Sequence, residues 1–282
     1  MQLAKTPRIL VLRRQGRPTM WLSFIALTTI FPAVAQAFRG RASRDAVFWG
    51  AMTLGIAGPL MWVAVHYAQA WQTGLSATLW VTIAASMTLY AIVAVAFRPA
   101  WRLSPLIAGY MLLLGFAAIL LQDTEGESMQ ATPGDRAWVS VHIATAVVTY
   151  GLVTIAAVSA FAAFLQERTL KRKRTTALTR HLPSIADSEA LQLTLLRYGE
   201  TILALGLATG MALQYRESGH FLPINHKTVL TLAAFVVIGA LLMAQRLAGM
   251  RGRQAARAAL LGYLLLTLGY PGVKFVTQVL IR

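Results

Sequence analysis

Residues 138–165 read WVSVHIATAVVTYGLVTIAAVSAFAAFL, an apolar run that contains no Asp, Glu, Lys or Arg. A helix rises about 1.5 Å per residue, so about 20 residues of this kind cross the hydrocarbon core of a bilayer. The apolar residues are continuous and do not alternate with polar ones, which favours a helix over a strand of a membrane barrel. The stretch therefore predicts a transmembrane helix.

The rest of the chain repeats this pattern. Of its 282 residues 57% are hydrophobic and 13% charged, a composition that excludes a disordered protein and argues against an ordinary soluble domain. Apolar blocks bounded by charge, Pro or Gly predict eight spans, at residues 20–38, 46–68, 74–97, 103–122, 138–165, 195–214, 226–245 and 257–280. The predicted fold class is all-α: a polytopic membrane helix bundle of about eight transmembrane helices, forming a single integral-membrane domain over residues 20–282.

The basic residues indicate the direction of the helices. The chain has 26 Lys and Arg against 10 Asp and Glu, but they are spread between the apolar blocks, so the expected partner is the lipid bilayer and no nucleic acid is expected. The odd-numbered connections carry 16 of these residues, whereas the even-numbered connections and the C-terminus carry 5. The positive-inside rule then predicts a multi-pass protein of the bacterial inner (plasma) membrane, with both termini on the outer, periplasmic side.

The basic N-terminal tail, residues 1–19, contradicts this direction. It carries five basic residues that would have to lie on the outer side: Lys5, Arg8, Arg13, Arg14 and Arg17. One interpretation is that the protein begins at Met20 and the tail does not belong to it. The other is a signal peptide that ends at Ala35-Gln36-Ala37, although Arg39, Arg41 and Arg44 would then follow the cleavage site on the outside.

No catalytic constellation is visible. The chain has no Cys, which excludes disulfides and thiolate metal sites, and no Gly-rich phosphate loop, carboxylate pair or Ser/His/Asp set. We therefore expect the protein not to be an enzyme in its own right. The basic loop 166–194 is expected to continue the fifth span as an amphipathic stalk through residues 167–174. Gly206 and Gly210 allow close helix packing in the sixth span.

Four of the five His residues fall on the predicted outer side. His66 ends the second span, His142 starts the fifth, His226 starts the seventh and His220 precedes it, whereas His181 lies in the basic loop. A His at a membrane boundary commonly makes only an interfacial hydrogen bond, and this interpretation stays open for each. Imidazole is also an axial ligand of haem iron, so His66, His142 and His226 are candidate metal ligands.

The surroundings of these His residues favour a flat apolar cofactor over a metal centre with carboxylate ligands. Trp62, Tyr67, Trp71, Trp138 and Phe221 are expected at the same depth, as in any interfacial aromatic belt. Lys227 and Lys274 lie near the outer boundary and are candidate partners for the two propionates of a haem. Snorkelling of the two lysines to the headgroups would also explain their positions.

The C-terminal half resembles the cytochrome c assembly family of haem-handling membrane proteins, and within it the short eight-span branch typified by YpjD and HemX. The resemblance covers about residues 46–282 and is carried by residues 142–166, Leu182-Pro183, His226-Lys227-Thr228, 249–253 and 262–275. It implies a haem-binding protein that acts in cytochrome or respiratory-complex biogenesis, with haem b as the cofactor. Other cytochrome-assembly or respiratory membrane proteins are the implied partners.

Two departures from the family pattern leave the role open. The loop that is rich in tryptophan in full-length members reads here, at residues 222–228, LPINHKT, and no external His follows the last span. His142 sits where the first external His of the family would be. A retained haem is thus as well supported as delivery of haem to an apocytochrome. The alternative is a cofactor-free permease-like or scaffold subunit that docks a cytoplasmic partner through loop 166–194.

Overall fold

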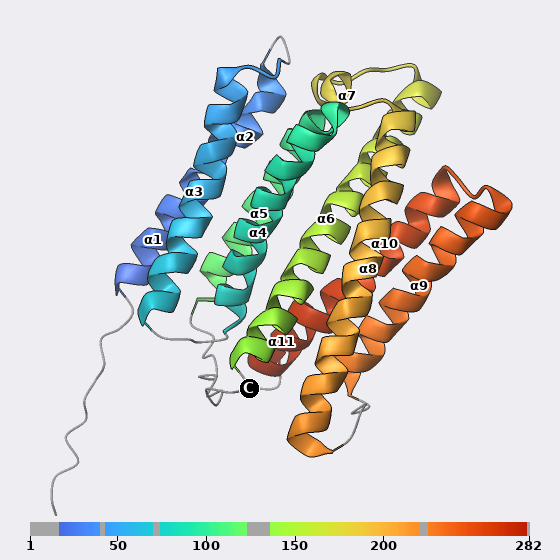
Figure 1. Cartoon of the computed structure of the whole chain (residues 1–282). Helices are drawn as coiled ribbons and strands as arrows, with labels where there is room; N and C mark the ends of the chain where they lie inside the picture. The colour runs from blue at the N-terminus through green and yellow to red at the C-terminus, as the bar shows by residue number, and fades with distance from the viewer. Residues whose placement is uncertain (1–16, 40–42, 70–73, 123–135, 220–224, 281–282) are drawn as a thin grey trace, which may run out of the picture.

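The computed structural model describes residues 17–39, 43–69, 74–122, 136–219 and 225–280, and within them the chain forms helices and no strand. Antiparallel helices stand side by side in one bundle (Figure 1). They are α1 (Arg17–Thr28), α2 (Phe31–Ala35), η1 (Gln36–Phe38), α3 (Ala46–Gln69), α4 (Leu75–Ala96), η2 (Arg98–Leu103), α5 (Ser104–Leu120), α6 (Arg136–Arg172), α7 (Ala177–His181), α8 (Ile185–Ser218), α9 (His226–Ala248), α10 (Arg253–Thr267), η3 (Leu268–Gly272), α11 (Val273–Phe275) and η4 (Val276–Leu280). The all-α membrane bundle predicted from the sequence is confirmed.

Six helices of the described chain are long and apolar enough to cross a membrane: Ala46–Ala68, Leu75–Ala96, Arg98–Leu120, Ala137–Arg172, His226–Ala248 and Arg253–Val279. Two of the eight predicted spans fall outside this group. The first is the shorter apolar helix Met20–Ala35. The sixth is α8, a helix of 34 residues that carries Arg197 and Glu200 within its predicted span.

The first membrane element breaks between α1 and α2. Pro32 has no amide hydrogen to continue the helix ladder, and it occupies the first turn of α2. Thr29 bonds back to the carbonyl of Ala26 through its hydroxyl, at 2.7 Å. A Cβ atom at Gly58 would lie 2.0 Å from the Thr29 Oγ1, so α3 packs on the break closely enough to require glycine there.

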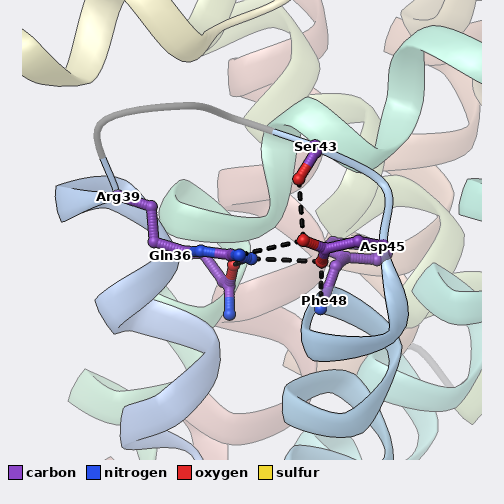
Figure 2. Close-up of polar contacts among 5 residues, drawn as sticks. All are labelled: Gln36, Arg39, Ser43, Asp45 and Phe48. Atoms are coloured by element: carbon purple, nitrogen blue, oxygen red, sulfur yellow. Dashed lines mark hydrogen bonds and ion pairs between the residues drawn. The ribbon is translucent and has the colours of Figure 1, made fainter.

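A polar cluster joins this element to α3 (Figure 2). Arg39 binds both carboxylate oxygens of Asp45, at 3.1 and 2.9 Å, and also donates to Gln36 Oε1 at 3.0 Å. Ser43 Oγ donates to Asp45 Oδ2, and the amide of Phe48 donates to Asp45 Oδ1. The hydrogen bond from Arg39 is the main reason that the pKa of Asp45 lies well below its usual range. Asp45 thereby caps α3 and holds it beside η1.

Helix α6 is the central element, since it packs against α4, α8 and α10. It continues beyond its apolar part as predicted for the stalk, but it ends at Arg172, two residues before the predicted end at 174. Glu167 in this part pairs with Lys171 at 2.6 Å and approaches Arg253 at 3.5 Å. The α6–α8 connection is ordered by Gln166, whose Nε2 donates to the carbonyls of Thr179, Leu182 and Pro183.

The helix ends divide the molecule into two faces. The connections rich in Lys and Arg lie at one end of the bundle, between η1 and α3, at η2, around α7 and between α9 and α10 (Figure 1). The first residues of α1 lie at the opposite end, together with the C-terminal segment, which is formed by η3, α11 and η4. Most of the N-terminal tail lies outside the described residues.

Candidate functional site

A cavity of about 400 Å³ lies at the end of the bundle opposite the basic connections. It is formed by the first turns of α6 and α9, the last turns of α8 and the C-terminal segment. This volume lies in the range of about 300–1,000 Å³ that is usual for small-molecule and cofactor sites. Three residues predicted from the sequence line it: His142, Lys227 and Lys274.

The His142 ring is fixed by a contact between α6 and α8. Its Nδ1 lies 3.1 Å from the carbonyl oxygen of Gly206 and 3.3 Å from Thr209 Oγ1. A carbonyl oxygen only accepts hydrogen bonds, so Nδ1 carries the proton and donates it to Gly206. In this tautomer the ring lone pair is on Nε2. A backbone carbonyl that binds one imidazole nitrogen in this way is the usual support of a metal-ligating His.

Glycine on α8 gives this ring its space. A Cβ atom at Gly210 would lie 2.9 Å from His142 Cε1. Gly206 supplies the accepting carbonyl, and a Cβ there would lie 3.4 Å from Thr145 Oγ1. The close packing predicted from Gly206 and Gly210 is therefore present, and it positions the His142 ring in addition to bringing two helices together.

Positive charge collects at one edge of the cavity. Asn225 caps α9 by accepting from the amide of Thr228 at 2.9 Å, and Lys227 follows the cap in the first turn. A helix N-terminus favours an anion. Lys274 donates from Nζ to Thr78 Oγ1 at 2.7 Å and lies 5.6 Å from the centre of the Tyr270 ring. The edge therefore suits a ligand with carboxylate groups.

The C-terminal segment reaches the cavity through a widened helical turn. Pro271 lies inside the π-helical turn Leu268–Gly272, where its missing amide hydrogen interrupts the regular α-helical ladder. Gly269 allows a close approach to α9, because a Cβ there would lie 3.2 Å from Leu230 Cβ. These two features bring Tyr270 and Lys274 to the wall of the cavity.

The other two candidate ligands lie elsewhere. His226 is the first residue of α9; it is exposed and does not line the cavity, although Asn225 and Lys227 on either side of it do. His66 lies near the end of α3 and also does not line the cavity. The structure thus places one of the three candidate ligands, His142, in the cavity wall.

His66 belongs to an aromatic stack. Its ring lies parallel to that of Trp62, with centres 4.6 Å apart, and Trp62 stacks on Trp80 at 5.5 Å. Trp62 Nε1 donates to Ser23 Oγ at 2.8 Å, which anchors the stack to α1. The Nε2 of His66 is buried and has no hydrogen-bond partner within the described chain. An unpartnered buried ring nitrogen costs free energy, so this atom is a second candidate for a ligand contact.

The remaining predicted residues are accounted for as follows. His181 ends α7 at the basic end of the bundle, away from the cavity. Trp138 is exposed near the start of α6, whereas His220, Trp71 and Phe221 lie outside the described residues. Over the residues that the structure does describe, no three His, Cys, Asp or Glu side chains come together as a metal site.

Sequence reasoning missed Tyr150, Asn225 and Tyr270, which line the cavity, and Thr209, which contacts the His142 ring. Thr209 lies three residues after Gly206, which places both on one face of α8. That spacing could have indicated the helix face that receives the His142 ring. Tyr150 and Tyr270 give no comparable signal, because a single aromatic residue in an apolar span is usual.

The chain is similar to known proteins over most of its length. Residues 54–281 match the model of the Cytochrome C assembly protein family. The chain is 52% identical over 254 residues to an uncharacterized 28.8 kDa protein of Azospirillum brasilense, covering 90% of this chain and 93% of that one. It is 28% identical over 180 residues to the inner membrane protein YpjD of Escherichia coli K12, covering 64% of this chain and 66% of YpjD. The matched region includes every residue that lines the cavity.

Proposed function

Because the chain belongs to the cytochrome c assembly protein family, we propose that it binds haem b in the cavity between α6, α8 and α9 and handles this haem in the inner membrane. The hydrogen bond from His142 Nδ1 to the carbonyl of Gly206 carries the proposal. It holds the ring in one orientation and leaves Nε2 as the nitrogen available to iron. An iron porphyrin supplies redox and ligand-binding chemistry to such a site.

The positive charges at one edge of the cavity would orient the cofactor by binding its propionate groups. Lys227 and the first turn of α9 offer positive potential to one propionate. Lys274 offers an ammonium to the other, with Thr78 and Tyr270 holding its position. The apolar remainder of the wall, from residues such as Ile143, Leu207 and Leu266, excludes water from the macrocycle.

His226 would be the second protein ligand of the haem iron, with His66 as the alternative or as the ligand of a second haem. His226 follows the α9 cap and is adjacent in sequence to two residues of the cavity wall. The unpartnered Nε2 of His66 supports the alternative. Because the chain contains no Cys, it would hold a haem without a thioether bond.

The proposed role is in the biogenesis of a cytochrome or another respiratory complex, by retaining haem or by presenting it at the outer face. The cavity lies at the less basic end of the bundle, which the positive-inside rule predicts to face outward. This location supports the proposed role. Partners would then be membrane proteins of the same assembly process.

The test is the visible spectrum of the protein purified in detergent, followed through single substitutions. The wild type should carry haem with a Soret band, and His142→Ala should lose the band or shift it. His181→Ala is the matched control, because His181 lies at the other end of the bundle, and it should leave the spectrum unchanged.

His226→Ala and His66→Ala assign the second ligand. A change in His226→Ala alone supports the preferred pair, whereas a change in His66→Ala alone supports the alternative. A wild-type protein without haem after expression with excess haem would reject the proposal. An unaltered haem content and spectrum in His142→Ala would reject this cavity as the site.

A further inference from the structure

A second cavity, of about 540 Å³, lies between α5, α6 and α10. Its rim is made by exposed apolar side chains: Leu113 is 69% exposed, Phe161 42% and Leu260 38%. All three helices are candidate spans, so the cavity opens toward lipid. Gly109 in its wall has no atom within 4 Å of a Cβ position, which leaves the interior free.

Two tyrosines line this cavity, and their hydroxyl groups belong to a hydrogen-bonded network. Tyr110 on α5 hydrogen-bonds to Tyr263 on α10, and both line the cavity. The Tyr263 hydroxyl lies 3.2 Å from that of Tyr150 on α6, and the Tyr150 hydroxyl lies 3.2 Å from Thr267 Oγ1. Thr267 Oγ1 lies 2.8 Å from the backbone carbonyl oxygen of Tyr263. Four hydroxyl groups therefore form one chain, and Tyr150 also lines the first cavity.

The direction of this chain follows from counting protons. Each hydroxyl has one proton to donate. The backbone carbonyl of Tyr263 only accepts, so the Thr267 hydroxyl donates its proton there and accepts a hydrogen bond from the Tyr150 hydroxyl. The Tyr150 proton is then used, so the Tyr150 oxygen accepts a hydrogen bond from the Tyr263 hydroxyl. By the same step, Tyr263 must accept from Tyr110.

Within the described part of the protein, Tyr110 is therefore the end of this row of hydroxyl groups that accepts no hydrogen bond. Its proton goes to Tyr263, so its oxygen keeps acceptor capacity, and Tyr110 is one of the residues that line the second cavity. The acyl chains of phospholipids would fill an apolar groove but carry no hydrogen-bond donor. Three aromatic rings, those of Tyr110, Phe161 and Tyr263, line the cavity and favour contact with another aromatic ring.

We propose that the second cavity binds a membrane-dissolved phenol, an aromatic ring with an apolar tail, whose hydroxyl group donates to the oxygen of Tyr110. The apolar body of the ligand lies against Leu113, Phe161 and Leu260. This site is separate from the haem cavity, and the inference does not depend on haem binding.

A matched pair of probes tests the donor. Nonylphenol and its methyl ether have nearly the same apolar shape, but only the phenol can donate a hydrogen bond. Saturable binding of each radiolabelled probe is measured with the full chain in phosphatidylcholine nanodiscs, against empty nanodiscs. One hydrogen bond has a net worth of about 1 kcal/mol, so the phenol should bind about fivefold more tightly than the ether.

Three variants locate the site and its direction. Gly109→Leu should abolish saturable binding of both probes by filling the cavity. Gly50→Leu is the matched control, because Gly50 also has open space at its Cβ position but lies on α3. Tyr110→Phe should remove the preference for the phenol. Tyr263→Phe should release the Tyr110 proton, so that the ether gains affinity and the preference falls.

The proposal is overturned by any of three results. The wild type binds phenol and ether equally, or neither probe saturably. Gly109→Leu binds both probes as the wild type does. Tyr110→Phe retains the fivefold preference while the Gly50→Leu control behaves normally.

Discussion

His142 shows how one side chain depends on the residues around it. Its ring is held by a carbonyl and a hydroxyl of α8, and it lies in a space that only glycine leaves open. The ring orientation is thus decided by Gly206, Thr209 and Gly210 together. Each of these residues is expected to influence a bound cofactor through the position of the His142 ring.

Gly210→Ala tests this dependence. The new Cβ would lie 2.9 Å from His142 Cε1, so the ring must move. Overpacking of this kind costs about 1–3 kcal/mol. We expect a shifted Soret band and reduced haem content, measured on protein purified at equal yield. Gly50→Ala, with nothing within 4 Å, should match the wild type, and an unchanged spectrum in Gly210→Ala would show that the ring is not constrained from this side.

Asp45 gives a prediction for pH. Its pKa in the folded protein is lowered by Arg39, Phe48 and Ser43. A lowered folded-state pKa stabilises the protein above the unfolded-state pKa, about 4, and this contribution is lost as the pH falls below that value. The melting temperature of the wild type should therefore exceed that of Asp45→Asn at neutral pH, and the gap should narrow in acid. A gap that stays constant down to pH 3 would contradict this account.

At the scale of the elements, α8 carries both a basic and an acidic residue, Arg197 and Glu200, inside its predicted span. Arg197 donates to Gln245 Oε1 at 3.1 Å and so pairs α8 with α9. Glu200 lies against α9 at Gly239, whose Cβ position is 3.0 Å from Oε1. Its Oε2 is buried without a partner in the described chain. At the α8–α9 contact, the Arg197 guanidinium therefore has a hydrogen-bond partner, whereas Glu200 Oε2 has none in the described chain.

Glu200→Leu should stabilise the protein. It removes a buried oxygen without a partner, a defect that costs about 1–3 kcal/mol. Glu189→Ala is the contrasting variant on the same helix, because Glu189 Oε1 accepts from the amide of Gly252 at 3.1 Å, and its loss should lower the melting temperature. Thermal unfolding in detergent measures both. A lower melting temperature for Glu200→Leu would indicate that this carboxylate has a partner in the membrane.

At the scale of the whole molecule, charge separates the two ends of the bundle. The basic connections gather at one end of the bundle (Figure 1), and the cavity that contains His142 lies at the other. The positive-inside rule predicts that the basic end lies on the inner side of the membrane. The cavity would then face outward, where an assembly protein would present its cofactor.

Single cysteines test this orientation, since the natural chain has none. Ser128→Cys lies in a connection with four acidic residues, and Thr175→Cys lies in the basic loop next to α7. An impermeant maleimide applied to intact spheroplasts should label the first and not the second, whereas lysed membranes should label both. Labelling of Thr175→Cys in intact spheroplasts would show that the topology is the opposite of the predicted one.

The amino-acid sequence by itself determined the fold class and the helices closely. The predicted spans 46–68 and 226–245 correspond to α3 and α9, because a run of apolar residues bounded by charge or Pro leaves the backbone no other way to satisfy its hydrogen bonds in lipid. The break after Thr29 and the turn at Pro271 escaped prediction, since a proline in an apolar run is compatible with a kink, a stop or a continuing helix.

Only the tertiary structure decided which polar groups meet. His142 and Gly206 are 64 residues apart, and the Tyr110 and Tyr263 hydroxyls 153 apart, so both contacts depend on how α5, α6, α8 and α10 are rotated about their axes. Apolar residues surround these helices on most sides, so the hydrophobic pattern does not specify that rotation. Close packing at glycines and the hydrogen bonds between hydroxyl groups specify the rotation of the helices. In the resulting structure His142 lies in the cavity wall, whereas His66 and His226 lie outside it.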